Sequence, residues 1–191
     1  MAASVGAKTR RYWGSFVLAL VGVLIFGASF VLSWVHLSAN GATGDIWIYN
    51  WACVSFSGST ICAAAGSSGA TWPLANTVAE YLLFAAIALG VLTFIFAAVG
   101  GKSTATVALG GLGFILGISA PLLFLGYSYY SNWIGDGGLF ASPQTAGTGW
   151  YLAIVGAVFL LIAMLLAWSK GKASTVPPAP AMSAPPGPMT P

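Results

Sequence analysis

Four long apolar segments divide the chain, and polar or aromatic residues bound each of them. The segments cover about 13–36, 78–99, 104–127 and 150–168. Each is close to the roughly 20 residues that a helix needs to cross a hydrocarbon core about 30 Å thick. Backbone amides cannot remain unpaired in lipid, so each segment must be helical. The pattern therefore predicts an all-α transmembrane four-helix bundle.

The segments outside these helices give the domain organisation. Residues 100–103 alone join the second and third helices, so these two helices must be antiparallel neighbours. The other two connections are long enough to have structure of their own. The predicted parts are an N-terminal segment at 1–11, a membrane domain at 12–169 with outer loops at 37–77 and 128–149, and a proline-rich, disordered tail at 170–191.

Charged residues mark the two sides of the membrane. All six basic residues precede the first apolar segment, follow the fourth, or lie between the second and third. The three acidic residues, Asp45, Glu80 and Asp136, lie in or beside the two outer loops. Cytoplasmic loops carry an excess of Lys and Arg. We therefore expect a multi-pass protein of the cell membrane with both termini cytoplasmic and loops 37–77 and 128–149 extracytoplasmic.

The first outer loop contains the sequence of a hairpin. Residues 45–53 are rich in β-branched and aromatic side chains, which favours a strand. Residues 53–62 are symmetric about a central Ser-Gly pair, so a two-residue turn would oppose Cys53 and Cys62 directly. Opposed cysteines on an extracytoplasmic face favour a disulfide. We therefore predict a Cys53–Cys62 disulfide that staples a small β-hairpin or sheet.

A metal site is the alternative interpretation of these two cysteines. His36 and Asp45 are the only nearby residues that could supply further ligands. Zinc sites usually have four ligands at characteristic spacings. We therefore expect a structural disulfide and no metal.

Composition restricts the classes of function. Hydrophobic residues make up 58% of the chain and charged residues 5%, and the chain has three carboxylates and one histidine. The Ser, Asp and His residues show no recognisable spacing of a nucleophile and its base, so we expect no enzyme. The basic residues are scattered at helix ends, so the net charge of +3 does not indicate binding to nucleic acid.

His36 and Glu80 are candidates for ligand or ion contact because they are ionisable residues beside membrane helices. His36 could bind a single haem or chlorophyll, but Met164, a second axial ligand for haem, is expected at the opposite membrane face. A hydrogen-bonded interfacial histidine is the favoured alternative. Glu80 is best interpreted as a carboxylate near the positive end of a helix dipole. We therefore expect no cofactor, with a pigment on His36 as the alternative.

The third apolar segment carries a helix-packing motif. It contains Gly110, Gly113 and Gly117, and the last two have the spacing that allows helix backbones to approach closely. The motif predicts a seam with the second or fourth helix of the same chain, or alternatively a dimer interface. Pro121 should kink this helix near Gly117.

Several features together resemble the claudin and peripheral myelin protein superfamily, over roughly 12–170. The chain has four spans and a tryptophan, Trp34, at the outer end of the first helix. Its first outer loop has an Asn-Trp pair followed by two cysteines, which are Asn50, Trp51, Cys53 and Cys62. The resemblance implies a small extracellular β-sheet on a left-handed four-helix bundle. One residue rather than two separates Trp51 from Cys53, and the tail lacks the scaffold-binding motif of many claudins, so the resemblance implies a claudin-like fold more than paracellular sealing.

The sequence thus favours a non-catalytic integral membrane protein that acts through lateral and extracytoplasmic contacts. Its expected partners are membrane lipids and either other integral membrane proteins or copies of itself. An accessory or structural subunit of a larger membrane complex is the first expectation, and a claudin-like adhesion or barrier protein is the second. A small channel or transporter, or a subunit that binds one haem or pigment, is a distant third.

Overall fold

The computed structural model describes residues 13–39, 42–49, 51–64, 74–100, 103–130 and 145–173. Its helices are α1 (Trp13–Val31), α2 (Leu74–Val99), α3 (Ser103–Tyr130) and α4 (Thr148–Ala173). All four contain a segment that is long and apolar enough to cross a membrane. The prediction of four such helices is confirmed, and their lengths and composition are those of a multi-pass membrane protein.

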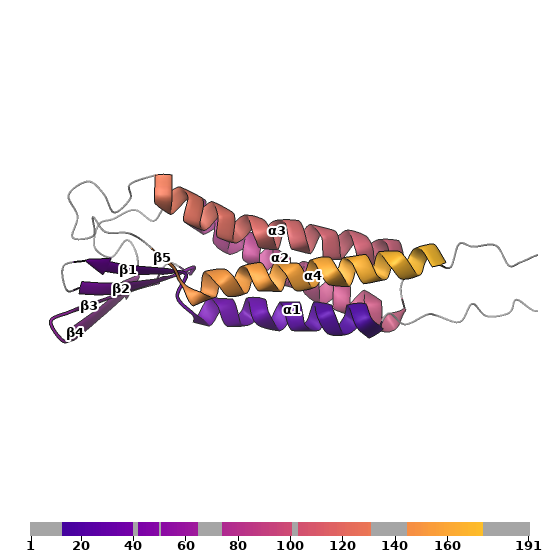
Figure 1. Cartoon of the computed structure of the whole chain (residues 1–191), viewed down its shortest axis with the longest axis horizontal. Helices are drawn as coiled ribbons and strands as arrows, with labels where there is room; N and C mark the ends of the chain where they lie inside the picture. Colours follow the sequence, from indigo (N-terminus) through magenta and orange to yellow (C-terminus); the bar gives the residue numbers. More distant parts are fainter. Residues whose placement is uncertain are drawn as a thin grey trace, which may run out of the picture.

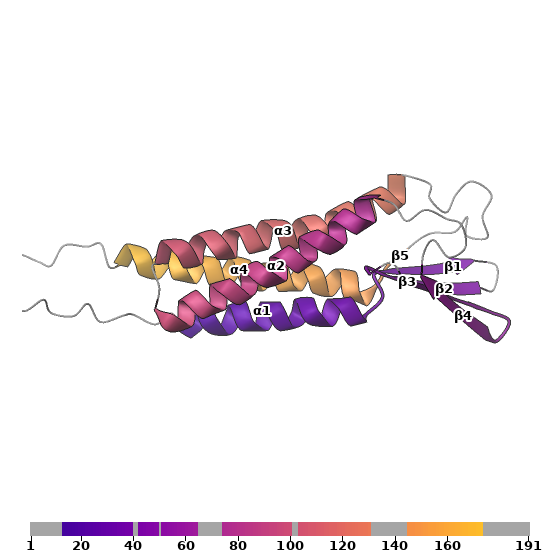
Figure 2. The same ribbon diagram turned by 180° about the vertical axis from the view of Figure 1, so that it is seen from behind.

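The four helices lie side by side in an elongated bundle, with a small sheet at one end (Figures 1 and 2). α1 packs against α2 and α4, and α3 packs against the same two helices. The turn at Gly100 lies at the end away from the sheet, and its positive φ of 76° is the left-handed conformation that commonly ends a helix. Adjacent helices are therefore connected alternately at the sheet end and at the opposite end.

The sheet has five strands in the order β4-β3-β2-β1-β5, and every neighbouring pair is antiparallel. The strands are β1 (Val35–Ala39), β2 (Ala42–Trp47), β3 (Trp51–Phe56), β4 (Ser59–Ala64) and β5 (Thr145–Ala146). Four of them come from the segment between α1 and α2, and β5 precedes α4. The predicted hairpin is thus part of a larger sheet that also includes residues from the second long connection.

The first helix is shorter than the predicted 13–36. α1 ends at Val31, and β1 begins at Val35, because the chain bends to join the sheet. The main-chain N–H of Trp34 donates to the Ile46 carbonyl over 2.7 Å, a bond that a continuing helix could not make. The other three helices extend beyond their predicted bounds of 78–99, 104–127 and 150–168.

The strand expected over 45–53 is interrupted. β2 ends at Trp47, a turn follows at 48–49, and β3 begins at Trp51. The apolar and aromatic residues of this stretch therefore belong to two antiparallel strands. Its β-favouring composition identifies strand residues without locating the turn between them.

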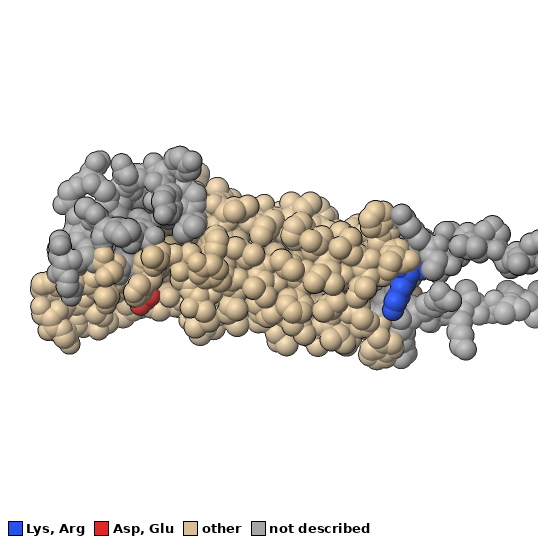
Figure 3. Space-filling model, viewed as in Figure 1, with Lys and Arg blue, Asp and Glu red and all other residues tan. Residues whose placement is uncertain are grey.

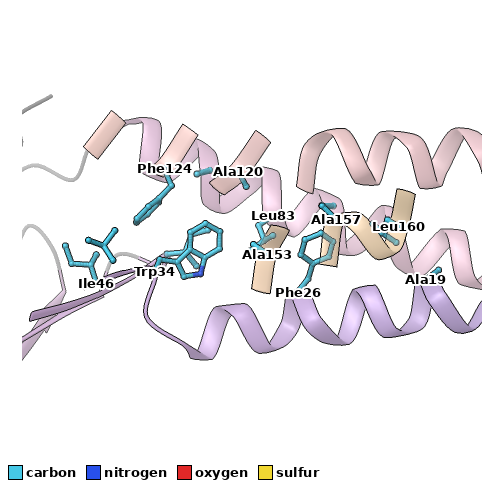
Figure 4. Packing of buried hydrophobic residues seen from close by; sticks show 14 of the residues in the cluster. Ala19, Phe26, Trp34, Ile46, Leu83, Ala120, Phe124, Ala153, Ala157 and Leu160 are labelled. Atoms are coloured by element: carbon cyan, nitrogen blue, oxygen red, sulfur yellow. The ribbon is translucent and has the colours of Figure 1, made fainter. Parts of the chain in front are cut away.

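The aromatic ring of Phe26 is buried in the interior of the bundle (Figure 4). Two glycines make room for it: a Cβ on Gly117 of α3 would lie 2.5 Å from Phe26 Cζ, and one on Gly156 of α4 would lie 2.9 Å from Phe26 Cδ1. α1 and α4 also approach each other closely, since a Cβ on Gly22 of α1 would lie 3.1 Å from the carbonyl oxygen of Gly156 of α4. Small residues therefore allow α1, α3 and α4 to approach closely around one large ring.

Candidate functional site

Two tryptophans fasten the sheet to the end of α1. The Trp34 side chain is fully buried between the sheet and the bundle, in edge contact with Phe124 of α3 (Figure 4). Its Nε1 donates to the Ser29 carbonyl over 2.8 Å, and Trp47 Nε1 donates to the Val31 carbonyl over 3.1 Å. The last four carbonyls of a helix lack intrahelical donors. The two indoles satisfy two such carbonyls, so the sheet is bonded directly to α1.

The start of α4 adds a second attachment. Gly147 donates its N–H to the Trp34 carbonyl over 2.9 Å, and Gly149 donates to the Ser33 carbonyl over 2.8 Å. A Cβ on Gly147 would lie 2.3 Å from the Ser33 carbonyl oxygen, so no larger residue fits this approach. Trp150 Nε1 donates to the Pro121 carbonyl over 2.7 Å, which links α4 to α3. The sheet and the bundle are therefore joined through both long connections.

The β3–β4 hairpin has the predicted register. Phe56 pairs with Ser59 and Cys53 pairs with Cys62, and the two cysteines form a disulfide with a Cα–Cα distance of 4.0 Å. Ser57 and Gly58 both have positive φ, 48° and 84°, as a type I′ turn requires. The predicted disulfide and hairpin are confirmed.

The hairpin extends away from the membrane helices. β3 begins near the bundle, because Trp47 just before it is bonded to α1, and the strand runs outward to the turn after Phe56. Figures 1 and 2 show β3 and β4 reaching beyond the ends of the helices. The tip of the hairpin therefore lies beyond the ends of the four helices that are long enough to cross a membrane.

One face of the sheet is apolar and only partly covered. Directly paired residues share a face, which places Val35 and Ile46 on the same face as Val54, Phe56 and Ile61. Val35 and Ile46 are buried, whereas Phe56 is 56% exposed and Ile61 is 73% exposed. We call Val54, Phe56 and Ile61 the hairpin apolar patch. The patch continues a buried apolar face outward to Phe56 and Ile61, which are more than half exposed.

The opposite face carries the disulfide and polar pairs. His36 and Asp45 are directly paired, and Nδ1 lies 2.9 Å from Oδ1 at an exposed position. Ser55 Oγ and Thr60 Oγ1 are 2.8 Å apart across the hairpin. The hairpin itself, residues 51–64, contains no Lys, Arg, Asp, Glu or His. The hairpin apolar patch is therefore electrically neutral.

The sequence-predicted ligand candidates are not brought together. His36 lies on β1 rather than at the end of a membrane helix, and its ring faces Asp45. Glu80 is on α2 and partly buried. Within the described ranges no group of three or more His, Cys, Asp or Glu residues is arranged to hold a metal ion. In the loop signature, Trp51 is partly exposed on β3, and Asn50 lies outside the described residues.

The predicted packing glycines face other helices of the same chain. A Cβ on Gly110 would lie 3.3 Å from Met164 Cβ of α4, and one on Gly113 would lie 3.4 Å from Leu89 Cβ of α2. Gly117 faces Phe26 of α1, as described above. Pro121 lies inside the continuous helix α3.

Sequence reasoning missed the glycines on the other helices that serve the same purpose. These are Gly22 on α1, Gly90 on α2 and Gly156 on α4, together with Gly147 and Gly149 at the sheet junction. Their partners are distant in sequence, and their spacing within each helix is not a recognised motif. Small residues recurring in each apolar segment were the available signal.

The sides of the bundle are apolar. Large exposed side chains such as Leu24, Phe84, Ile115 and Val158 lie along all four helices. In the view of Figure 3, the Lys and Arg side chains of the described residues appear at the end away from the sheet, where Lys170 lies, and the Asp and Glu side chains of these residues appear near the sheet. These sides can contact lipid or the membrane helices of another protein.

Comparison with known proteins identifies no relative, since no protein-family model matches this chain and no curated protein resembles it in sequence.

Proposed function

We propose that this chain is a non-catalytic integral membrane protein that acts through protein–protein contacts, as an accessory or structural subunit of a larger membrane complex. The observation that carries the proposal is the hairpin apolar patch. Phe56 and Ile61 are more than half exposed on a hairpin that reaches away from the membrane helices. Exposed apolar residues that cluster beyond the ends of the helices are typical of surfaces that bind another protein.

The attachment of the hairpin supports the same proposal. An interaction surface binds more tightly when it is ordered before binding, since less conformational entropy is then lost. The Cys53–Cys62 disulfide orders the hairpin, and the indoles of Trp34 and Trp47 bond the sheet to α1. A partner that docks on the patch would therefore be held at a fixed position relative to the bundle.

We also propose that the sheet end is extracytoplasmic and that the bundle spans the cell membrane with both termini in the cytoplasm. Disulfides persist in oxidising compartments, and the disulfide is at the sheet end. Asp45 is on the sheet, whereas Lys170 is near the opposite end of α4. That separation agrees with the excess of basic residues on cytoplasmic segments.

A claudin-like adhesion or barrier protein is the second candidate. Four membrane-length helices carry an antiparallel sheet whose main part follows the first helix, a disulfide joins two of its strands, and Trp34 is buried where the sheet meets the bundle. These features are compatible with a claudin-like fold. The specific observation that favours this candidate is the uncharged outer strand β4, which could pair with another chain.

Co-purification with matched charge substitutions tests the proposal. The tagged full chain is isolated from its native membrane in a mild detergent, and its partners are quantified by mass spectrometry. Ile61→Lys places a charge on the hairpin apolar patch, and the control Thr43→Lys places the same charge on the opposite face of the sheet. We expect a stoichiometric protein partner with the wild type and with the control, and its loss with Ile61→Lys. Equal recovery with all three chains would contradict a role for the patch.

A further inference from the structure

The outer edge of the sheet is a strand without the usual protection against pairing. β4 is at one end of the strand order, and it is paired with β3 over all six of its residues. Natural edge strands are commonly blocked by charged side chains, proline, a bulge or very short length. β4 has the sequence Ser-Thr-Ile-Cys-Ala-Ala and a regular register, so it contains none of these features. The other edge, β5, has only two residues.

We propose that β4 pairs antiparallel with β4 of a second copy of this chain, with the two Ile61 side chains opposed. The inference rests on the second candidate for the proposed function, adhesion, because it takes the hairpin as the interaction surface and names a second copy as the partner. It assigns a further role to the strand edge that the hairpin apolar patch borders.

The main-chain groups available for this pairing follow from the turn. In a two-residue hairpin the residues that flank the turn, here Phe56 and Ser59, exchange hydrogen bonds, and bonded and non-bonded pairs then alternate. The N–H and C=O groups of Thr60 and Cys62 therefore point away from β3. No main-chain group of the described residues outside the sheet bonds to Thr60 or Cys62.

In one register, the outward main-chain groups of Thr60 and Cys62 are paired in both chains. A two-fold axis at Ile61 places Thr60 of each chain opposite Cys62 of the other, and every outward N–H and C=O of these residues then has a partner. The two Ile61 residues form a non-hydrogen-bonded pair, in which the Cα atoms are about 4.5 Å apart and the side chains are closest. An isologous contact of this kind closes as a dimer.

The chemistry of the hairpin favours a second copy as the occupant. Residues 51–64 carry no charged side chain, so two copies can approach without like-charge repulsion. Pairing covers Ile61, which is 73% exposed, with an identical side chain. The patches of the two chains then form one continuous apolar strip, because Val54 is paired with Ile61 on the same face.

Antiparallel pairing also fixes where the two bundles lie. β4 runs from Ser59 at the outer tip of the hairpin toward Ala64 and the bundle (Figures 1 and 2). A strand paired antiparallel runs the other way, so the second bundle lies beyond the tip of the first. The contact therefore joins chains in two facing membranes rather than neighbours in one membrane.

Vesicle docking tests this pairing with the full chain. The protein is reconstituted into two populations of phosphatidylcholine vesicles that carry a donor or an acceptor fluorophore, and docking is followed by energy transfer. Thr60→Pro removes one outward N–H without removing a main-chain bond to β3, but it also removes the Thr60 hydroxyl that bonds to Ser55. Ile61→Lys opposes two like charges. We expect both variants to reduce docking by about tenfold or more, and the control Thr43→Lys to dock like the wild type. Retention of the Cys53–Cys62 disulfide, measured by mass spectrometry, shows that each variant has folded.

The outcomes separate this inference from the proposed function. Wild-type vesicles that do not dock, or docking that survives both Thr60→Pro and Ile61→Lys, would overturn the pairing between copies. If docking fails but Ile61→Lys still releases a different membrane protein in the co-purification, only the pairing between copies is wrong. If neither docking nor co-purification depends on Ile61, both proposals are wrong.

Discussion

The ring of Phe26 is closely confined within the bundle. It is fully buried on α1, and it lies against Gly117 of α3 and Gly156 of α4. A methyl group on Gly117 would lie 2.5 Å from Cζ of the ring and 3.5 Å from Ala157 Cβ. Because the ring also contacts Gly156, it cannot move toward α4 to make room. Gly117→Ala must therefore separate α3 from α1 or force the ring into an unfavourable rotamer.

The expected cost follows from these contacts. Overpacking a filled site by one methyl group typically lowers the free energy of unfolding by about 1–3 kcal/mol. The higher helix propensity of alanine offsets up to about 1 kcal/mol of this loss. We expect Gly117→Ala to lower the free energy of unfolding by about 1–2 kcal/mol. Gly27→Ala is the matched control on α1, since its Cβ would meet nothing within 4 Å. That substitution should be neutral or stabilise by up to about 1 kcal/mol.

A double-mutant cycle identifies the cause. Phe26→Leu removes the distal ring atoms that the new methyl group would meet, so Gly117→Ala should cost less in this background. We expect a coupling energy of about 1 kcal/mol between the two sites, which is within the range for residues in contact. The assay is reversible unfolding in mixed micelles followed by circular dichroism. Additive effects, or equal effects of Gly117→Ala and Gly27→Ala, would refute the packing argument.

Three further substitutions test the sheet and its attachment. Trp34→Phe keeps an aromatic ring but removes the donor to the Ser29 carbonyl, so thermal unfolding should show a loss of about 1–2 kcal/mol; no loss would mean that this bond does not hold the sheet. Replacing Cys53 and Cys62 by serine should destabilise the hairpin by about 3 kcal/mol, because the disulfide closes a loop in the unfolded chain between cysteines that are nine residues apart, and hydrogen exchange should accelerate in β3 and β4 but not in the helices. His36→Ala should change the unfolding free energy by less than about 1 kcal/mol, because its contact with Asp45 is exposed; a larger change in a thermal melt would indicate an additional contact.

Local features of the sequence predicted the hairpin correctly. The residues between Cys53 and Cys62 specify their own register, because symmetric neighbours and a Ser-Gly turn leave one way to oppose the two cysteines. The four apolar helices were predictable for a similar reason, since length and composition decide whether a segment can cross a membrane.

Contacts between distant residues were not predictable in this way. The end of α1 at Val31 depends on bonds from Trp34 to β2 and from Gly147 to Trp34, and an apolar sequence continues through this bend. The slot for Phe26 depends on Gly156, which is far away in the sequence. In each case a local pattern shows that a residue is small or apolar, but it does not show which distant residue it meets.

Photo-cross-linking in the native membrane tests whether the hairpin apolar patch is an interaction surface. A photo-activatable amino acid is placed at Ile61, where the side chain is 73% exposed, and in a control chain at Thr43 on the opposite face of the sheet. We expect a discrete cross-linked protein product from position 61, either a second copy or one defined membrane protein, and little product from position 43. No protein product from position 61, or the same products from both positions, would contradict it.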